Sequence, residues 1–379
     1  MANFRVPLKK YVDSSYDIEV GSNLYGKLSR DLKDGIIENV NRYAIITDSN
    51  VKDLFGEHLL NLLRNDGFYV EMFTFPSGEQ NKTRETKAQL EDQMLAKSYG
   101  RDSCIIALGG GTVSDLSGYL AGTYCRGIPY INYPTTLLAA ADASIGGKTA
   151  VNTPVATNLI GVFHQPRKVY IDLITWGTLP YRQIRSGLAE TIIHACLGDI
   201  NFFQYLENNI ARLYSPNNEL SLDNEVCEHI AFKNCEIKFR VVEKDDEEKN
   251  FRKVLNLGHT AGRAIEALSN YNLLHGEAVA IGLAFQAYLG KKLNFNTIDE
   301  YRRIINLLKL AELPTEIPND IKSVDLINKM YTDKKVRNSQ IHFVFQDGIG
   351  KMKQFNSGDY SIPISEELLL ESLDEFRKL

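Results

Sequence analysis

The residues of this chain best suited to chemistry include two histidines that neighbour glycine. His259 follows Gly258 in LNLGHT, at a predicted helix start, and His275 precedes Gly276 in LLHGEA. Glu190, in SGLAE, could supply a third ligand. One carboxylate and two imidazoles with an open position are typical of catalytic zinc sites, where the metal binds hydroxyls and lowers their pKa. Because the three residues are far apart in the sequence, spacing alone does not establish the site.

His194 is a second candidate ligand. It lies one helical turn after Glu190 and could itself bind a metal. We favour a packing role for this histidine.

A glycine-rich stretch, GGGTVSDLSG, runs from Gly109 to Gly118 between a predicted buried strand, CIIAL, and a predicted helix. Glycines let backbone amides approach a pyrophosphate closely, and a helix N-terminus adds positive electrostatic potential. The stretch indicates nucleotide binding, although a tight structural turn would have the same composition.

Asp142 and Lys148 lie in YPTTLLAAADASIGGKTAVN, a segment rich in small residues. Small residues permit close approach of a ligand, a carboxylate can exchange protons with a hydroxyl, and an ammonium group can bind phosphate. A structural salt bridge is the alternative interpretation.

These candidates need elements to position them, and the first half of the chain predicts a parallel sheet. Between residues 40 and 175, short apolar runs alternate with helical patterns, which is typical of a Rossmann-like fold. The predicted strands are RYAIIT, FYVEMFTF, CIIALGG, PYINY and KVYIDL, and TRETKAQLEDQMLAKS is a predicted helix. Asp48 follows the first strand, where it could bind an adenine ribose or serve as a turn residue.

The second half is predicted to be mainly helical. Helix spacing is found in NFFQYLENNIARLY, EVCEHIAFKNCEIKFRVVEK, GHTAGRAIEAL, GEAVAIGLAFQAYLGKKL and EYRRIINLLKL. We therefore predict an α/β plus α protein. A Rossmann-like domain would span residues 1–175, and a mainly helical domain would span residues 176–379.

Composition narrows the possible functions. The chain of 379 residues is 44% hydrophobic and 24% charged, and its net charge of -5 offers no basic surface for nucleic acid. Its five cysteines lack CxxC spacing, which argues against disulfides or structural zinc and favours a reducing compartment. Without a signal-peptide pattern or an apolar run of about 18 residues, we expect a cytoplasmic protein with no membrane partner.

Taken together, the motifs resemble those of the 3-dehydroquinate synthase family of sugar-phosphate cyclases. The resemblance runs from SGEQNKT at Ser77 to DKK at Asp333. It is carried by GGGTVSDLSGYLAGTYCRG, PTTLLAAADASIGGKTAVN, NLIGVFHQP, SGLAE, RKVLNLGHT and LLHGEAVAIG. It implies an NAD domain followed by a metal domain, an active site between them, and a homodimer.

The resemblance also implies which residues bind the cofactors. The divalent metal, usually zinc with cobalt as the alternative, would be bound by Glu190, His259 and His275. Besides Asp48, the residues expected to contact NAD are Glu79, Lys82, Gly110, Gly111, Asp115, Thr135, Thr136 and Lys148.

The substrate contacts are implied in the same way. Asp142 and Lys148 would lie between nicotinamide and substrate, and Lys238 and Arg252 would bind a carboxylate. The expected phosphate contacts are Lys148, Asn158, Asn256, one of Lys334 or Lys335, and Arg126 of the partner subunit.

The implied reaction converts 3-deoxy-D-arabino-heptulosonate 7-phosphate, a phosphorylated sugar acid, into 3-dehydroquinate and phosphate. A hydride leaves a secondary alcohol for NAD and later returns, phosphate is eliminated in between, and an intramolecular aldol step closes the ring. The cofactor is regenerated in each turnover, so no second redox substrate is needed.

Three positions depart from the family pattern. Ile193 stands where GLAEVIKYG has a lysine, which removes a cation expected beside the substrate. Arg263 stands where GHTxGHAIE has a phosphate-contacting histidine; arginine can still bind phosphate but would not shuttle a proton. Thr157 of ATN replaces a cofactor-side lysine of GKN.

These departures leave several interpretations open. We favour a 3-dehydroquinate synthase with a modified site, because a substrate without a carboxylate would not require Lys238 and Arg252. A sister cyclase of secondary metabolism, of the amino-dehydroquinate, 2-epi-5-epi-valiolone or 2-deoxy-scyllo-inosose type, is the main alternative. The intact metal residues argue against an inactive paralogue, and ASIGGKTAVN argues against a polyol dehydrogenase of the same architecture.

Overall fold

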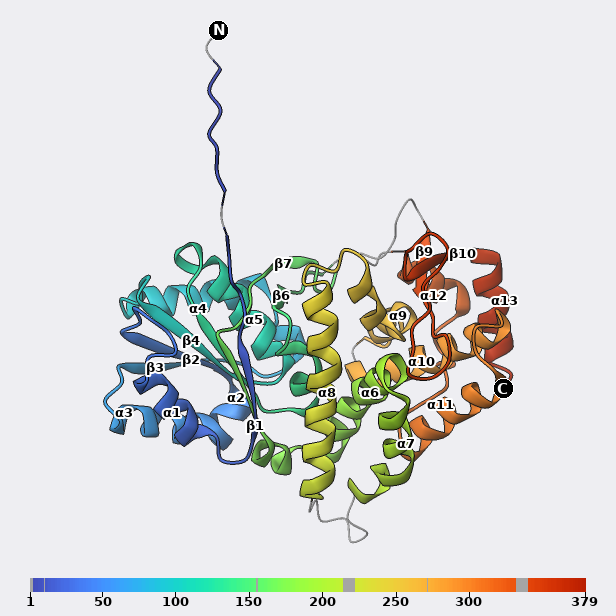
Figure 1. The fold of residues 1–379 in the computed structure, drawn as a ribbon, viewed down its shortest axis with the longest axis horizontal. Helices are drawn as coiled ribbons and strands as arrows, with labels where there is room; N and C mark the ends of the chain where they lie inside the picture. Colours follow the sequence, from blue (N-terminus) through green and yellow to red (C-terminus); the bar gives the residue numbers. More distant parts are fainter. Residues whose placement is uncertain (1–2, 10, 155, 214–221, 271, 332–339) are drawn as a thin grey trace.

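The computed structural model describes residues 3–9, 11–154, 156–213, 222–270, 272–331 and 340–379. Its N-terminal part is built on a six-stranded sheet in the order β1-β8-β5-β4-β2-β3, in which all neighbouring strands run parallel (Figure 1). This arrangement confirms the predicted Rossmann-like sheet. The strands are β1 (Asp17–Gly21), β2 (Arg42–Asp48), β3 (Val70–Phe75), β4 (Ser103–Gly109), β5 (Tyr130–Pro134) and β8 (Lys168–Asp172).

Both faces of the sheet are apolar, as expected for a parallel sheet covered by helices on each side. Successive side chains of a strand alternate between faces, so Ile45 and Ile46 of β2 belong to two separate buried clusters. Leu28 and Leu59 complete one cluster, and Leu116 belongs to the other. The covering helices are α1 (Tyr25–Lys33) and α3 (Glu57–Asn65) on one face, and α4 (Arg84–Ala96) and α5 (Gly111–Thr123) on the other.

The N-terminal part also contains a short helix and a β-hairpin. The short helix α2 (Ser49–Val51) follows β2, and β6 (Lys148–Val151) pairs antiparallel with β7 (Ile160–Phe163). The sequence patterns predicted neither β1 nor this hairpin, although the hairpin carries Lys148.

The C-terminal part is mainly helical, as predicted, and has one large apolar core. It also contains the antiparallel pair of β9 (Ile341–Val344) and β10 (Ser361–Ile364), which the sequence patterns did not predict. Its helices are α6 (Tyr181–Gly198), α7 (Ile200–Asn209), α8 (Asn224–Lys244), α9 (His259–Leu268), α10 (His275–Lys292), α11 (Ile298–Leu310), α12 (Ser323–Met330) and α13 (Glu366–Phe376).

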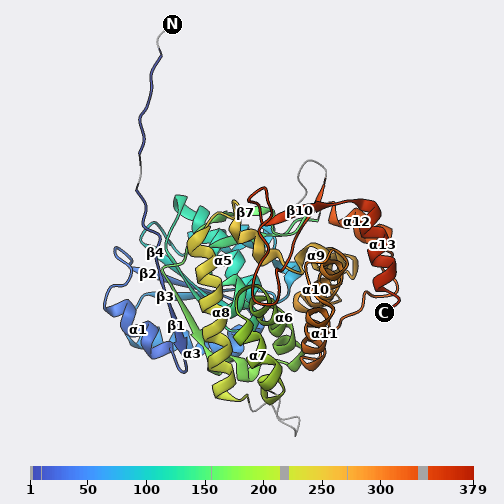
Figure 2. The same cartoon turned by 45° about the vertical axis from the view of Figure 1, so that its right-hand side comes forward.

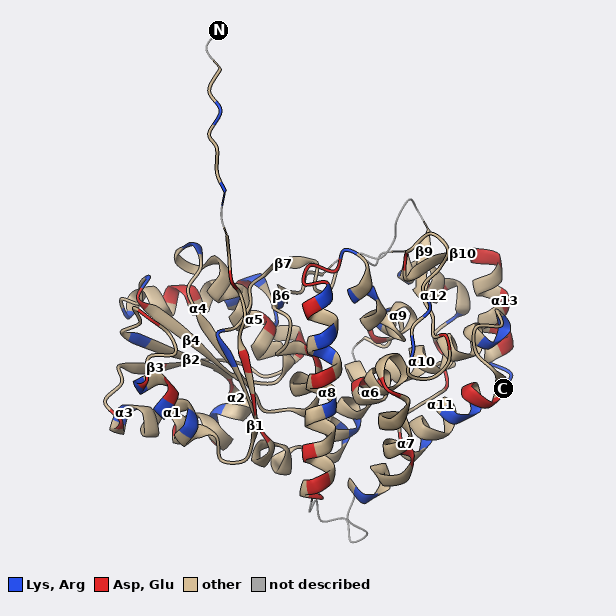
Figure 3. Ribbon diagram, in the orientation of Figure 1, with Lys and Arg blue, Asp and Glu red and all other residues tan. Residues whose placement is uncertain are grey.

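The long helix α8 stands between the two parts in both views (Figure 1 and Figure 2) and contacts β1 on one side and α6 on the other. Acidic and basic residues are interspersed over both parts (Figure 3). Among the described residues we find no helix with the length and apolarity needed to cross a lipid bilayer.

Helix α10 packs closely against α6 and α9 through glycines. A Cβ atom at Gly276 would lie 1.9 Å from the carbonyl oxygen of Ser186 in α6. A Cβ at Gly282 would lie 2.0 Å from the carbonyl oxygen of Gly258, which precedes α9. Both distances are far below van der Waals contact, so only glycine allows these backbones to approach. The contact brings together three helices that each carry one predicted metal ligand.

Gly282→Ala is therefore expected to destabilise the protein by about 1 to 3 kcal/mol, because an extra methyl in a packed interior forces the backbones apart. This loss would occur even though alanine is the better helix former. Denaturant unfolding measures the change. Gly177→Ala is the matched control, since a Cβ at Gly177 meets nothing within 4 Å. Equal stability of the two variants would contradict the close packing.

Candidate active site

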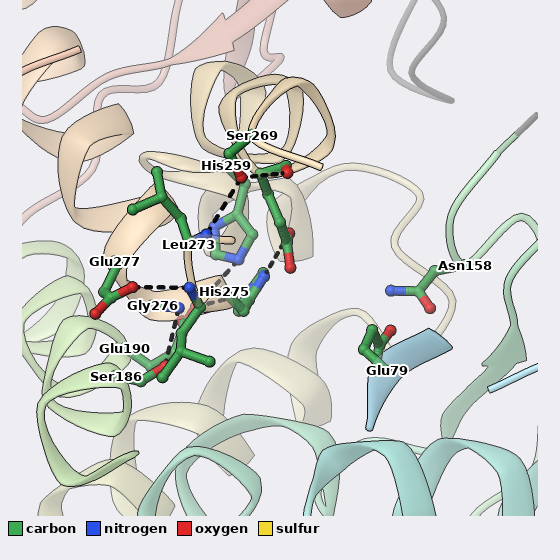
Figure 4. A network of polar contacts seen from close by, with 12 residues as sticks. Glu79, Asn158, Ser186, Glu190, His259, Ser269, Leu273, His275, Gly276 and Glu277 are labelled. Atoms are coloured by element: carbon green, nitrogen blue, oxygen red, sulfur yellow. Dashed lines mark hydrogen bonds and ion pairs between the residues drawn. The ribbon is translucent and has the colours of Figure 1, made fainter. Parts of the chain in front are cut away.

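Glu190, His259 and His275 lie together in the structure (Figure 4), although the sequence separates them widely. One ligand atom from each lies within 4.8 Å of the others. The Nε2 atoms of His259 and His275 are 3.2 and 3.5 Å from Oε1 of Glu190. Glu190 comes from α6, and the histidines are the first residues of α9 and α10.

Hydrogen bonds orient both imidazoles. Nδ1 of His259 donates to the carbonyl oxygen of Leu257 at 3.0 Å, and Nδ1 of His275 donates to Oε2 of Glu266 at 3.0 Å. In the neutral form of each ring, Nε2 would carry the lone pair, and in the structure it points toward Glu190. A carboxylate or carbonyl behind a ligating imidazole is the usual arrangement at protein metal sites. The sequence patterns did not single out Glu266, since an acidic residue within an amphipathic helix carries no distinctive signal.

The start of α10 is fixed to α6, which positions His275 relative to Glu190. The backbone N–H of Gly276 donates to Oγ of Ser186 at 3.1 Å (Figure 4). The carboxylate of Glu277 accepts from the backbone N–H of Leu274 at 2.8 Å and from the Arg182 guanidinium at 2.7 Å. Because Ser186 and Arg182 both belong to α6, the two ligand-bearing helices are held in register.

The electrostatics of the triad favour a bound cation. Burial would raise the pKa of Glu190, but the two imidazoles hold it well below its usual range. Burial disfavours the charged form of His275, yet Glu266 and Glu190 raise its pKa to about 10. Oε1 of Glu190 is buried and faces the Nε2 atoms of both histidines. One carboxylate oxygen and two imidazole nitrogens fit a divalent metal that keeps an open position.

His194 lies in the core beside this site. Its Nδ1 is 3.0 Å from Oδ1 of Asn234, whose Nδ2 donates to Thr191. Burial lowers the pKa of His194, so the imidazole is neutral. The metal-binding group found among the described residues does not include it, in agreement with the predicted packing role.

The glycine-rich stretch begins α5 at the carboxyl end of β4, as the sequence predicted. Gly110 precedes the first helical residue, Gly111, and no side chain caps the helix N-terminus. The backbone N–H of Thr135 donates to the Gly109 carbonyl at 2.9 Å. Oγ1 of Thr136 accepts from the backbone N–H of Ala139 at 3.1 Å. Uncapped N–H groups at a helix start form a site for phosphate.

A cluster of charged groups lies beside this helix. The ammonium group of Lys82 is 2.6 Å from Oε1 of Glu79 and 3.1 Å from Oδ2 of Asp115. Lys82 is only 3% exposed. Burial raises the pKa of Asp115 to about 6 despite Lys82, whereas Lys82 outweighs burial and lowers the pKa of Glu79. The structure thus brings together three residues that were predicted to contact NAD.

Asp48 ends β2 and caps α2. Its Oδ1 accepts hydrogen bonds from the backbone N–H groups of Asn50 and Val51, at 2.9 and 3.0 Å. The turn role considered from the sequence is therefore present in the structure. A ribose contact through the other oxygen stays a prediction.

A cavity of about 270 Å³ is lined by residues of both parts of the chain, among them Asp115 of α5 and His259 of α9. Asp142 forms an ion pair with Lys238 of α8, which outweighs burial and lowers the pKa of Asp142 to about 2. The sequence left open a salt bridge between Asp142 and Lys148. The described residues instead pair Lys148 with Glu248, whose Oε2 lies 2.7 Å from Nζ of the lysine. The predicted site residues that line the cavity are Asp115, Asp142, Lys148, Asn158, Lys238, Arg252, Asn256, His259 and Arg263.

Arg252 is fully buried at the wall of this cavity. Its guanidinium donates to the carbonyl oxygens of Asp246, at 2.5 Å, and Gly146, at 2.9 Å, whereas Nε has no hydrogen-bond partner among the described residues. Burial lowers the pKa of Arg252, and the nearby carboxylates of Glu248 and Asp142 oppose that effect.

The remaining predicted residues lie in different places. Asn158 lines the cavity, and its Oδ1 is buried without a hydrogen-bond partner among the described residues. Arg126 is exposed on the turn after α5 and is not among the residues that line the cavity. Lys334 and Lys335 lie outside the described residues. Ile193 is completely buried in the apolar core and does not line the cavity.

The comparisons with known proteins cover most of the chain. The family model for the N-terminal part of 3-dehydroquinate synthase matches residues 72–186, and the model for its C-terminal part matches residues 187–336. A 3-dehydroquinate synthase from Caldanaerobacter subterraneus subsp. tengcongensis is 44% identical over 81% of this chain and 85% of its own. The Thermoanaerobacter sp. protein of that name is 40% identical over 95% and 97%.

Solved structures agree with these sequence matches. A 2-epi-5-epi-valiolone synthase from Streptomyces hygroscopicus, with NAD+ and Zn2+ bound, has a TM-score of 0.86, 26% identity and 99% coverage of both chains. A 2-deoxy-scyllo-inosose synthase, complexed with carbaglucose-6-phosphate, NAD+ and Co2+, has a TM-score of 0.83 and 25% identity, with 94% of this chain and 96% of that chain covered. A glycerol dehydrogenase from Schizosaccharomyces pombe, 16% identical with a TM-score of 0.62 over 98% of this chain and 92% of its own, shares the fold.

The parallel sheet, the mainly helical second part and the cavity lined by residues of both parts match solved sugar-phosphate cyclases, and the chain is an enzyme of that class. Within that class, the chain belongs to the 3-dehydroquinate synthase family, because both family models and relatives of about 40% identity match most of its length. This membership confirms the resemblance found in the sequence.

Glu266→Ala is expected to weaken zinc binding about 10- to 100-fold, because His275 would lose the carboxylate that orients its ring. A competition titration with a chromogenic chelator measures the affinity. Glu243→Ala, an exposed position on α8, is the control for the loss of one negative charge. An unchanged zinc affinity in Glu266→Ala would show that His275 is oriented by other contacts.

Proposed function

We propose that this protein is a 3-dehydroquinate synthase, which converts 3-deoxy-D-arabino-heptulosonate 7-phosphate into 3-dehydroquinate and inorganic phosphate. The observation that carries the proposal is the cavity, which has the metal-ligand residue His259 and the cationic side chains Lys148, Lys238, Arg252 and Arg263 in its wall. A substrate with a hydroxyl group to be oxidised, a carboxylate and a phosphate would offer a partner to the metal and to each of these cationic side chains. Family membership and the names of the relatives support the same reaction.

Two cofactors complete this proposal. Glu190, His259 and His275 would hold a divalent metal, and the uncapped N-terminus of α5 would hold the pyrophosphate of NAD. When bound, the metal lowers the pKa of a substrate hydroxyl, and NAD takes up and returns the hydride that allows phosphate elimination. The buried acceptor on Glu190 and the uncapped N–H groups fit these two ligands.

The carboxylate of the substrate would bind at the α8 side of the cavity. Lys238 supplies an ammonium group there, and Arg252 supplies its unpartnered Nε. The backbone carbonyls that accept from the rest of the guanidinium fix its position, so little freedom is lost on binding. Asp142, held ionised by Lys238, can accept a hydrogen bond from a substrate hydroxyl.

The phosphate would bind at a second group of residues in the cavity wall. Lys148 of β6, Asn158 of the β6–β7 connection and Asn256 before α9 converge there, with Arg263 one turn into α9. Arginine offers two parallel N–H donors to a phosphate, so Arg263 can replace a histidine as a phosphate ligand. Proton transfer to the leaving phosphate would then use another group, such as an oxygen of the phosphate itself.

A homodimer is part of the proposal. Cys125, Arg126 and Gly127 form a run of three positive φ angles, of 51°, 69° and 111°. Left-handed backbone at non-glycine residues costs about 1 to 3 kcal/mol each and persists where surrounding structure and function require it. Arg126 is exposed on this turn, so it is free to enter the phosphate site of a second subunit.

A sister cyclase is the second candidate, and Ile193 is the observation that favours it. A family lysine is absent at this position, and two sister cyclases have TM-scores of 0.83 and 0.86 against this chain. However, Ile193 is packed in the apolar core rather than at the cavity. The substitution therefore changes core packing and leaves the observed cavity wall intact.

The substrate is tested by incubating the purified protein with NAD and zinc, with the phosphorylated sugar acid and sedoheptulose 7-phosphate in separate tubes. We expect phosphate release and a carbocyclic product from the acid alone. Glu190→Gln should remove this activity while the circular dichroism spectrum is retained, because the metal loses a charged ligand. Turnover of sedoheptulose 7-phosphate alone would identify a sister cyclase, and turnover of neither would identify an inactive relative.

Ile193→Lys tests whether the departure at this position sets specificity. We expect a loss of stability on the order of 3 to 5 kcal/mol, because an unpaired charge would be placed in an apolar core, and no gain in kcat/KM for the sugar acid. Ile193→Met, which keeps the position apolar, is the control. A gain of activity toward the acid in the lysine variant would show that the natural chain is adapted to a different substrate.

A further inference from the structure

Glu248 holds the two side chains that would receive the phosphate. Its Oε2 lies 2.7 Å from Nζ of Lys148, and its Oε1 accepts from Nδ2 of Asn256 at 2.8 Å. Lys148 and Asn256 both line the cavity, whereas Glu248 reaches them from the loop after α8. Each oxygen of the carboxylate thus occupies one donor, as two oxygens of a phosphate would.

The loop that presents Glu248 is held in a defined shape. It is the acidic segment of residues 245–248, drawn in red above α8 in Figure 3. The carboxylate of Asp245 accepts from the backbone N–H groups of Lys249, Asn250 and Arg252, at 2.8, 2.7 and 2.9 Å. Glu248 itself has a φ of 58°, in the left-handed region that side chains with a Cβ rarely adopt. A conformation of that kind persists where the surrounding contacts enforce it.

We propose that Glu248 is an internal competitor for the phosphate subsite. Its carboxylate binds Lys148 and Asn256 in the free protein, and an arriving phosphate must displace it. This inference rests on the proposed function, because it takes Lys148 and Asn256 as the phosphate-binding pair. It adds a residue that acts through these two side chains and sets how tightly the subsite binds its anion.

The chemistry of the contact distinguishes a competitor from a simple structural bridge. Lys148 and Asn256 offer donors to an anion, and a carboxylate can satisfy them but binds with a smaller charge than a phosphate dianion. The side chain of Glu248 is 16% exposed and that of Lys148 is 34% exposed, so the pair lies at the rim, where an ion pair is readily exchanged. Asp246 and Glu247 on the same loop are exposed, so the loop lies at the surface of the protein.

Displacement has opposite effects on binding and release. Competition by the Glu248 carboxylate weakens the affinity for the phosphorylated substrate. The same competition weakens the affinity for the product phosphate. Where release of the product phosphate limits turnover, an internal carboxylate that recaptures Lys148 speeds that release. The protein thereby exchanges some substrate affinity for faster turnover.

Glu248→Gln isolates the charge, because glutamine has nearly the same size and the same backbone preferences. Inorganic phosphate alone is titrated into the NAD- and zinc-loaded protein by isothermal titration calorimetry. The variant is expected to bind phosphate about tenfold or more tightly, since the competing charged hydrogen bonds are lost. In turnover assays, KM for the phosphorylated substrate should fall, and inhibition by inorganic phosphate should strengthen, without a rise in kcat.

Glu247→Gln is the matched control. Glu247 is the neighbouring residue, is exposed, and pairs with Lys249 at 2.6 Å instead of with the cavity. It changes the net charge and the loop composition equally, so its phosphate affinity should equal that of the unmodified protein. Equal tightening in both variants would assign the effect to net charge and would overturn the proposal.

A purely structural role predicts the opposite sign. If Glu248 only positions Lys148 and Asn256, Glu248→Gln will bind phosphate equally or more weakly, and the proposal fails. Should this variant not fold, Glu248→Asp decides, because its side chain is one methylene too short to reach both partners and should also tighten phosphate binding. If neither the unmodified protein nor any variant binds phosphate, the inference falls, while turnover of the sugar acid still decides the proposed function separately.

Discussion

The close approach of three helices is the constraint on which the rest of the structure depends. Glu190, His259 and His275 can share one cation only because α10 lies against α6 and α9 at distances that glycine alone permits. The hydrogen bonds of Ser186 and Glu277 then fix the start of α10, and Glu266 fixes the ring of its first residue. The apolar core of the helical part thus determines the geometry of a polar centre at its edge.

The site is built from ions that are already paired. Lys82 is paired with Glu79 and Asp115, Lys238 with Asp142, and Lys148 with Glu248. An unpaired charge is expensive to bury, so such pairing keeps the cavity stable before ligands arrive. In the proposed reaction, a substrate anion that binds Lys148 or Lys238 would therefore have to replace a protein carboxylate. The affinity for such an anion is then lower than the number of cations in the cavity suggests. The site discriminates more sharply among anions, because each must compete with a carboxylate.

Five strands of the sheet and several of the helices follow from apolar runs and helical spacing. The sequence patterns did not single out β1, the β6–β7 hairpin or the β9–β10 pair, whose strands have four or five residues each, nor the helices α1, α3, α6, α12 and α13. Strands β5 and β8 are equally short but were recognised, because they lie in runs that are buried along their whole length. Among site residues, Glu190, His259 and His275 were identifiable by type, but their convergence depends on helix packing. Glu266 and Glu248 were not identifiable, because an acidic residue on a helix or in a charged loop has the same pattern whether or not it faces a site.

The pairing of β1 with β8 has a consequence for how the chain is made. The backbone N–H groups of Asn23 and Leu24, just after β1, bind the carboxylate of Asp172 at the end of β8, up to 149 residues farther along the chain. At about 5 to 20 residues per second, a ribosome needs roughly 7 to 30 s to synthesise that intervening length. During this interval the first strand has no partner, and contacts of such long range form slowly even in the finished chain. The edge of the sheet is therefore the last part of the N-terminal fold to close, and the nascent protein depends on its other strands for protection from aggregation until then.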